Sequence, residues 1–250
     1  MKMIYALVAY FFIFSPLFAG YQVVLEDNTL DPRKGKNIIN MFVINETDTF
    51  KAININPKFR FITDDEEEIL QDTEDLLIFP SQLILPAKSE KAVSIRWTGS
   101  KDIPHELSYR AIVEELNVGK KIEKDSKTIR TKLKYVKSVY IAPFKEIKSI
   151  TLEKTEQTIN PETSEKMLEF TLFNNGTVRE YLENLMFEYV IPPNKIGTIL
   201  INMTDVDLQD KSPNLLSKRK LKGIIKWPES IPEDVKKFSL TYYNLESDEE

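Results

Sequence analysis

Residues 79–116 constrain the fold of this chain more than any other segment. They begin with Pro80-Ser81-Gln82-Leu83-Ile84-Leu85-Pro86, an apolar run bounded by prolines, which predicts a short strand followed by a turn. Ala92-Val93-Ser94-Ile95-Arg96-Trp97 then alternates apolar with polar residues, as a half-buried strand does. After a polar loop, residues 106–116 form a third strand-like run. The order strand, proline turn, strand, loop, strand is typical of an antiparallel β-sandwich.

Apolar runs of strand length also fill the rest of the chain, and they fall into two groups. The first group adds runs at residues 21–25, 37–45, 50–55, 59–62 and 128–142. The second group consists of runs at residues 150–152, 167–173, 185–191, 196–201, 221–227 and 238–242. Turn signals such as Asn174-Asn175-Gly176 separate the runs. Each group suits one sandwich, so the sequence predicts two all-β domains that meet near Pro143.

The first residues of the chain read as an export signal. A lysine lies near Met1, and residues 5–18 are almost wholly apolar. This run is shorter than the roughly 20 apolar residues that span a bilayer, so it favours a cleaved signal over a membrane anchor. We expect cleavage between Ala19 and Tyr21, because small residues follow the apolar run. The expected organisation is a signal at 1–19, a first domain at 20–143, a linker at 144–149, a second domain at 150–244 and an acidic tail at 245–250.

The composition argues against an enzyme. The chain has no cysteine and a single histidine, His105, which excludes thiol chemistry and a multi-histidine metal site. Its glycines do not cluster into a phosphate-binding loop, and its net charge of −5 comes from interspersed acids and bases, unlike a nucleic-acid footprint. Glu114 and Glu115 would face opposite sides of a strand and could not share one catalytic site. We therefore expect no catalytic residue, metal, cofactor, small-molecule substrate or nucleic-acid partner.

Two other features have plain structural interpretations. Residues 64–68 are consecutive acids, which predicts a solvated loop, with a calcium or partner site as the alternative. Trp97 and Trp227 continue apolar strand patterns, so we expect both to pack in domain cores.

The ordered motifs of residues 79–116 resemble the N-terminal domain of the periplasmic chaperones that assemble chaperone–usher pili. That family has a P-x-x-L-x-L-P-x turn, an apolar strand and a Y-R-x-x-x-x-E strand at this spacing, matched here from Pro80 and from Tyr109-Arg110 to Glu115. The resemblance implies two immunoglobulin-like β-sandwich domains in tandem, at an angle to each other. It also implies a non-enzymatic periplasmic chaperone. Such a protein caps pilus or surface-fibre subunits by donating an edge strand, and then passes them to an outer-membrane usher.

The same resemblance indicates which strand would be donated. Residues 128–142 follow the Tyr109 strand and end at Pro143, where the family's donor strand meets the hinge between domains. By period-2 counting, one face of this strand carries Ile129, Thr131, Leu133 and Tyr135, which would contact the subunit. On the family's V-F-V-x-P ending, Lys134 takes the position that anchors the subunit's terminal carboxylate. Lys137 is the alternative if a bulge shifts the register.

One position departs from the family pattern. Aligning Leu30 and Pro32 with the family's first turn places Asp27 where an arginine would complete the carboxylate anchor. Thr131 is also small for a donated residue. The alternative function is therefore an exported immunoglobulin-like structural or adhesive surface protein that donates no strand, and a carboxylate-based hydrolase is a remote third option.

Overall fold

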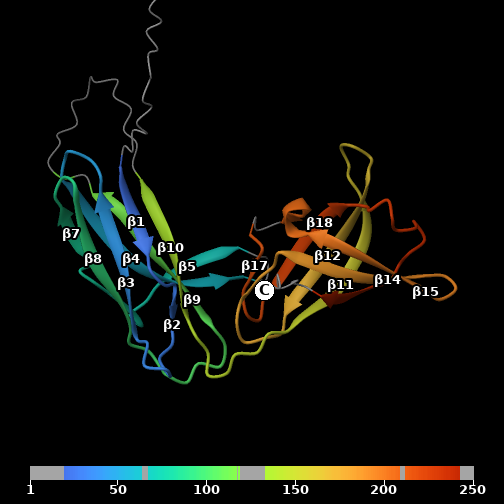
Figure 1. The fold of residues 1–250 in the computed structure, drawn as a ribbon, viewed down its shortest axis with the longest axis horizontal. Coiled ribbons are helices and arrows are strands. Elements are labelled where there is room, and N and C mark those ends of the chain that lie inside the picture. The colour runs from blue at the N-terminus through green and yellow to red at the C-terminus, as the bar shows by residue number, and fades with distance from the viewer. Residues whose placement is uncertain (1–19, 64–66, 117, 119–132, 209–211, 243–250) are drawn as a thin grey trace, which may run out of the picture.

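The computed structural model describes residues 20–63, 67–116, 118, 133–208 and 212–242. Within these ranges the chain is built from β-strands and one short 3-10 helix, η1 (Met203–Asp205). Figure 1 shows two β-sandwich lobes set at an angle, the first coloured blue to yellow-green and the second yellow to red. The predicted all-β fold with two immunoglobulin-like sandwiches in tandem is confirmed. The predicted signal at 1–19 and tail at 245–250 lie outside the described residues.

The first domain contains two sheets that face each other. One sheet has the order β1-β3-β8-β6, with the strands β1 (Tyr21–Leu25), β3 (Ile38–Asn45), β8 (Ser89–Trp97) and β6 (Leu76–Phe79). The other has the order β2-β10-β9-β4-β5, with the strands β2 (Thr29–Leu30), β10 (Lys134–Ile141), β9 (Leu107–Leu116), β4 (Lys51–Ile62) and β5 (Glu68–Asp72). Strand β7 (Gln82–Leu85) also pairs with β4.

The core of the first domain follows from the alternation seen in the sequence. Val93, Ile95 and Trp97 of β8 are all buried, which confirms the predicted face and the predicted place of Trp97. The indole ring of Trp97 meets the Tyr109 ring edge-on at 5.7 Å, and its N–H donates to the Ser100 carbonyl at 2.8 Å. A buried tryptophan therefore joins the two sheets without leaving its polar atom unpaired.

The second domain is divided into three sheets. The largest has the order β11-β12-β18-β16, with β11 (Ile150–Ile159), β12 (Lys166–Asn174), β18 (Lys220–Lys226) and β16 (Asp207–Leu208). A second sheet has the order β15-β14-β19, with β15 (Lys195–Asn202), β14 (Asn184–Ile191) and β19 (Phe238–Tyr242). The third pairs β13 (Glu180–Tyr181) with β17 (Asn214–Leu215). Phe170, Phe187 and Trp227 are buried in a core separate from that of the first domain, so the predicted burial of Trp227 is also confirmed.

The structure corrects two predicted elements. The runs predicted at residues 50–55 and 59–62 form one strand, β4, because its pairing with β9 continues past Pro57. Of the acidic run, residues 64–66 lie outside the described residues, but Glu68 opens strand β5 and is not in a loop. Arg60 and Arg110 bind its carboxylate, which explains how an acid is held in this strand.

Two other boundaries bear on the candidate site. Of the strand predicted at residues 128–142, the described part begins at Leu133, and β10 covers Lys134–Ile141. From there no strand forms before β11 begins at Ile150, and the predicted linker at 144–149 falls in this connection. No helix within the described ranges is long and apolar enough to cross a membrane.

Candidate functional site: a free strand edge and an interdomain cleft

Strand β10 has one paired edge and one largely free edge. It pairs with β9 over its whole length, Lys134 to Ile141. On its other side it pairs with β2 only at Tyr140 and Ile141. Among the described residues, the backbone of 134–139 therefore has no strand partner on this side. An unpaired edge of this kind can accept or complete the sheet of another protein.

The inward row of β10 lies at the rim of the first core. Leu133 and Tyr135 are half-buried and pack against that core, while Ile129 and Thr131 lie outside the described residues. The Tyr135 hydroxyl donates to the Tyr21 carbonyl at 2.5 Å. Each of the two side chains therefore packs on its own core and keeps part of its surface exposed.

Tyr21 of β1 links this rim to β9 and to the start of β10 through its hydroxyl group. Its hydroxyl lies between the carbonyls of Val113 and Leu133, at 3.0 and 3.1 Å. Burial, together with the neighbouring Tyr135 hydroxyl, raises the pKa of Tyr21 well above its usual value, so the phenol stays a neutral donor. The start of β10 is thus tied to β1 by side chains and not by a backbone ladder.

The two lysines predicted as anchors have different surroundings. Lys134 points to the outer face of the sheet, where its ammonium lies 3.3 Å from the Glu114 carboxylate. Lys137 belongs to the inward row and is half-buried, with its ammonium 5.9 Å from the centre of the Tyr135 ring. No carboxylate within the described ranges lies at ion-pair distance from Lys137. Of the two lysines, it is the one whose charge is available to a bound anion.

An arginine pair that the sequence did not single out lies on the outer face of the same sheet. Arg60 of β4 and Arg110 of β9 both bind Glu68 of β5, at 2.6 and 2.9 Å. Burial alone would raise the pKa of Glu68, but hydrogen bonds and charge from the two guanidinium groups outweigh it and lower the pKa. Arg110 also donates to the Ser138 hydroxyl on β10. The pair therefore leaves a net positive charge beside the donor-strand candidate.

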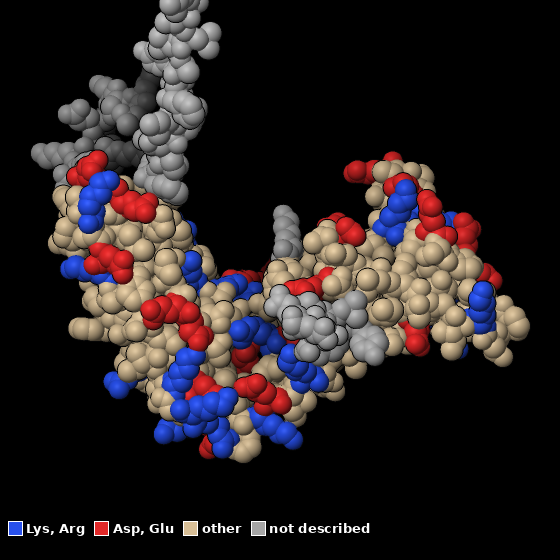
Figure 2. All heavy atoms as spheres, in the orientation of Figure 1, with Lys and Arg blue, Asp and Glu red and all other residues tan. Residues whose placement is uncertain are grey.

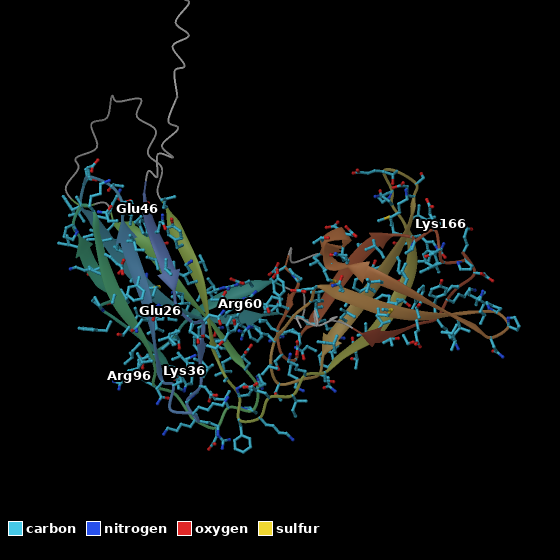
Figure 3. All side chains as sticks on the ribbon, viewed as in Figure 1. Glu26, Lys36, Glu46, Arg60, Arg96 and Lys166 are labelled. Carbon is cyan, nitrogen blue, oxygen red and sulfur yellow. The ribbon has the colours of Figure 1, made fainter. Side chains whose placement is uncertain are left out.

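This charged face borders a cleft between the domains. The hollow has a volume of about 160 Å³ and is lined by Arg60, Ile62 and Glu68 from the first domain. Its other wall comes from the second domain and consists of Asn214, Leu215, Leu216, Arg219 and Lys220. Figure 2 shows charged side chains gathered where the lobes meet, and Figure 3 shows Arg60 on the side of the first domain that faces the second. Three bases and one acid line the cleft, which suits an anionic ligand.

A buried ion pair fixes the joint beneath this cleft. Arg179 of the second domain binds Glu106 of the first, and its guanidinium stacks 3.6 Å from the centre of the Tyr140 ring. It also donates to the side-chain oxygens of Asn28 and Thr29, both at 3.3 Å. Burial raises the pKa of Glu106 to about 7, although the charge of Arg179 opposes this shift. Ionisation of the Glu106 carboxyl group near neutral pH therefore costs the folded protein free energy.

Asp27, which the resemblance led us to expect near the family's arginine position, has a local partner. Lys36 binds its carboxylate, and the Thr29 amide donates to it at 2.8 Å. The hydrogen bond from Lys36 is the main reason that the pKa of Asp27 is lowered, followed by the bond from Thr29. A negative charge is therefore held in the connection between β1 and β2. From the second domain, Arg179 bonds the neighbouring Asn28 and Thr29.

Adjacent acids on β9 have separate structural roles. Glu114 pairs with Lys134, while Glu115 lies 3.0 Å from the ammonium of Lys51 on the other side of the strand. In the part of the chain that the structure describes, no three His, Asp or Glu side chains gather into a cluster that could hold a metal.

The residues that sequence reasoning missed are Arg60, Glu68, Arg110, Arg179 and Glu106. Arg110 stood inside the Y-R-x-x-x-x-E motif, which was the one signal for this group. Its pairing with Glu68 was hidden because the acidic run read as a loop. The contact between Arg179 and Glu106 joins positions 73 residues apart, and no local pattern indicates it.

Comparisons with known proteins support the fold. No protein-family model matches the sequence, and no curated protein matches it either. Among solved structures, the class 5 fimbriae chaperone CfaA is 15% identical, with a TM-score of 0.51 over 88% of this chain and 98% of that one. A chain from a chaperone–tip adhesin complex of CFA/I fimbriae biogenesis is 17% identical, with a TM-score of 0.52 over 82% of this chain and 88% of that one.

A third similar structure comes from the archaic chaperone–usher Csu pili of Acinetobacter baumannii. It is a chain of the CsuC–CsuE chaperone–tip adhesion subunit pre-assembly complex, and it is 11% identical, with a TM-score of 0.50 over 85% of this chain and 90% of that one. The resemblance found in residues 79–116 is thus confirmed at the level of the fold. This chain has the two-domain β-sandwich fold of the fimbrial chaperones.

Proposed function

We propose that this protein is a periplasmic chaperone that binds pilus or surface-fibre subunits, caps them with the edge of β10 and delivers them to an outer-membrane usher. The observation that carries the proposal is the unpaired edge at residues 134–139, in the same sheet as the strands that line a basic interdomain cleft, in a fold shared with the fimbriae chaperone CfaA. The function is binding and not catalysis. Export through the signal at 1–19 is part of the same proposal.

Strand donation would use both the backbone and the inward row of β10. A subunit that lacks one strand has unpaired amides and carbonyls along a groove, and the free edge of β10 would pair with them. Leu133 and Tyr135 are half-buried at that edge, so a paired subunit would cover the flanks that their own core leaves open. Ile129 and Thr131 would extend the row along the groove. Each newly covered apolar group contributes to the capture free energy in proportion to its area.

The end of the subunit would be held by charge. Lys137 lies in the donated row without an acid partner among the described residues, so it is our choice for the carboxylate anchor. Arg110 and Arg60 add positive potential nearby, although both bind Glu68. Lys134 is the second candidate, and it would have to give up Glu114. Charge-assisted hydrogen bonds of this kind are shorter and stronger than neutral ones.

The solved neighbours support subunits as the class of partner. The Csu structure is a chaperone–tip adhesion subunit pre-assembly complex, and the CFA/I structure is a chaperone–tip adhesin complex. The competing function, an exported spacer or adhesive protein, requires neither a free strand edge nor a charged interdomain cleft.

The decisive experiment is co-expression of the full chain with a candidate fibre subunit in a bacterial periplasm. We expect a one-to-one complex, and we expect Leu133→Asp to abolish it because a carboxylate buried in the subunit's groove costs several kcal/mol. Leu77→Asp is the matched control, since Leu77 is exposed on the other sheet of the same domain. Val136→Asp, on the outer face of β10, separates contact with the groove from a general effect of charge on this strand. Tryptophan fluorescence of each isolated variant checks that it is folded.

The anchor has its own test. Lys137→Ala should weaken capture of a subunit with a native C-terminus more than Lys134→Ala does. Lys137→Ala should have little effect on the capture of a subunit whose C-terminus is extended by a few residues. A complex that survives Leu133→Asp in a folded chaperone would contradict donation through this row. Equal losses for both lysines with both subunit forms would remove the anchor assignment while leaving donation in place.

A further inference from the structure

Strand β15 is a long free edge in the second domain. It has eight residues and, among the strands that the structure describes, pairs only with β14, at the border of the β15-β14-β19 sheet. Figure 1 shows the β14–β15 hairpin at the end of the second lobe, away from the first domain. The β10 edge and the cleft therefore lie elsewhere, and β15 has no part in the proposed capture of subunits.

The composition of this edge differs from that of the other long edges. Edge strand β10 contains Lys134 and Lys137, and edge strand β11 contains Glu153, Lys154 and Glu156. In β15, residues 196–202 read Ile-Gly-Thr-Ile-Leu-Ile-Asn, with no charge and no proline. Charges and prolines are the usual protection of an edge strand against pairing with another chain. Strand β15 lacks that protection over seven consecutive residues.

The outer face of the hairpin is apolar as well. Ile196 is 64% exposed and Leu200 is 49% exposed, with Thr198 between them on the same face. In β14 their cross-strand partners are Val190 and Met186. On the inner face the Tyr189 ring packs over Gly197, where a Cβ atom would lie 2.4 Å from the ring. The edge is thus regular. Its inner face packs against Tyr189, and its outer face carries exposed apolar side chains.

The edge is complementary to a second copy of itself. In an antiparallel pair, residues on the same face lie opposite each other, so a two-fold axis through Thr198 places Ile196 opposite Leu200 of the other copy. Each outer row then continues from Val190 through Ile196 to Leu200 and Met186 of the second copy. Cross-strand apolar pairs of this kind stabilise antiparallel sheets.

The charges at the two ends of the strand are also complementary. β15 begins with Lys195, and the acids Glu183 and Asp205 lie at its other end, next to Asn202. Antiparallel pairing brings the lysine of each copy to the acidic end of the other. We propose that β15 is a self-association edge, through which two copies of this chain form a continuous antiparallel sheet centred on Thr198.

The test uses the full signal-free chain without any subunit. Sedimentation velocity over a dilution series should show a monomer–dimer equilibrium. Thr198→Lys places two like charges opposite each other at the two-fold axis and should weaken the dimer by at least about tenfold. Thr241→Lys is the matched control, because Thr241 is an exposed threonine of β19 at the other border of the same sheet, and it should leave the dimer unchanged.

A cross-link tests the register. The chain has no cysteine, so Thr198→Cys introduces a single thiol. Opposite residues of an antiparallel pair have Cα atoms about 4.5–5.5 Å apart, within the range that a disulfide bridges. Mild oxidation should give a disulfide-linked dimer with Thr198→Cys and far less with Thr241→Cys. A chain that stays monomeric at all concentrations, or equal cross-linking of the two variants, overturns the proposal.

Discussion

Each of the two domains contains a loop that is closed by the side chain of a buried asparagine. In the first, the buried amide of Asn45 at the end of β3 donates to the carbonyls of Thr49 and Pro86, at 2.8 and 2.7 Å. In the second, the buried amide of Asn174 at the end of β12 donates to the carbonyls of Val178 and Leu215, at 2.8 and 3.1 Å. Each side-chain oxygen also accepts from the amide two residues further on. One asparagine thus closes a loop in each sandwich.

The residue five positions further on differs, and so does the use of the loop. After Asn45 it is Phe50, which is exposed, and Figure 3 shows the neighbouring Glu46 at the end of the first domain away from the joint. After Asn174 it is Arg179, which binds Glu106 and Tyr140 of the other domain. The buried asparagine therefore builds the loop, and the residue five positions further on decides whether the loop faces solvent or joins two domains.

Removing either asparagine should produce the largest effect. Asn45→Ala and Asn174→Ala each remove several hydrogen bonds of a buried amide, among them the bond to the buried carbonyl of Leu85 or of Leu215, so we expect each to cost its own domain about 3 kcal/mol. The protein has one tryptophan in each domain, Trp97 and Trp227, so urea unfolding of single-tryptophan variants reports on each domain separately.

Asn40→Ala serves as the matched control, since Asn40 is exposed on the same strand as Asn45 and should change stability by less than about 0.5 kcal/mol. If Asn45→Ala shifts the Trp227 transition as much as the Trp97 transition, the two domains unfold as one unit and the loops do not act locally.

Removing the arginine should have the next largest effect, and only at the joint. Arg179→Ala leaves Glu106, whose side chain is 5% exposed, without its partner, and we expect a loss of about 2 kcal/mol in domain coupling. Small-angle scattering should show a wider range of domain angles, and proteolysis between residues 142 and 149 should become faster. Phe50→Ala, the equivalent change in the first domain, should leave both measurements unchanged. A broadened scattering profile for Phe50→Ala would break the comparison.

The smallest effect for each step of one pH unit should be the pH dependence that Glu106 contributes at the joint. Burial raises the pKa of Glu106 to about 7 in the folded protein, against the charge of Arg179, while Glu146 adds to the rise. A raised carboxyl pKa contributes stability that is complete below the unfolded-state pKa and is lost as the pH rises through about 7. The slope between pH 5 and 7 can reach about 1.4 kcal/mol per pH unit at most.

Glu106→Gln should remove this slope, as measured by urea unfolding at several pH values. His105 is the only histidine, and replacing it with asparagine in both proteins keeps imidazole titration out of the comparison. A slope that persists in Glu106→Gln would assign the pH dependence to other carboxyl groups.

The local periodicity of the sequence was enough to predict most of the fold. The strands predicted at residues 21–25 and 238–242 have the bounds of β1 and β19, because alternation with flanking turns is a local signal. Strand β5 was missed for the opposite reason. Its first residue, Glu68, reads as part of a charged loop until Arg60 and Arg110 are brought to it by β4 and β9.

The candidate site was predictable in its position but not in its details. The place of β10 before Pro143 indicated the strand, and parity placed Lys134 and Lys137 on opposite faces. The alternation of side chains along a strand could not show that Glu114 binds Lys134, or that Lys137 has no acid beside it within the described ranges.

By itself, the sequence determined an all-β chain of two sandwiches, the burial of Trp97 and Trp227, and the absence of disulfides, because these depend on composition and period-2 patterns. The tertiary structure alone decided which edges are free and which charges are paired. These properties depend on contacts between distant residues, such as Glu106 with Arg179 and Glu68 with Arg110. A strand's pattern specifies which face it buries, but only the assembled sheet shows whether a strand has a neighbour.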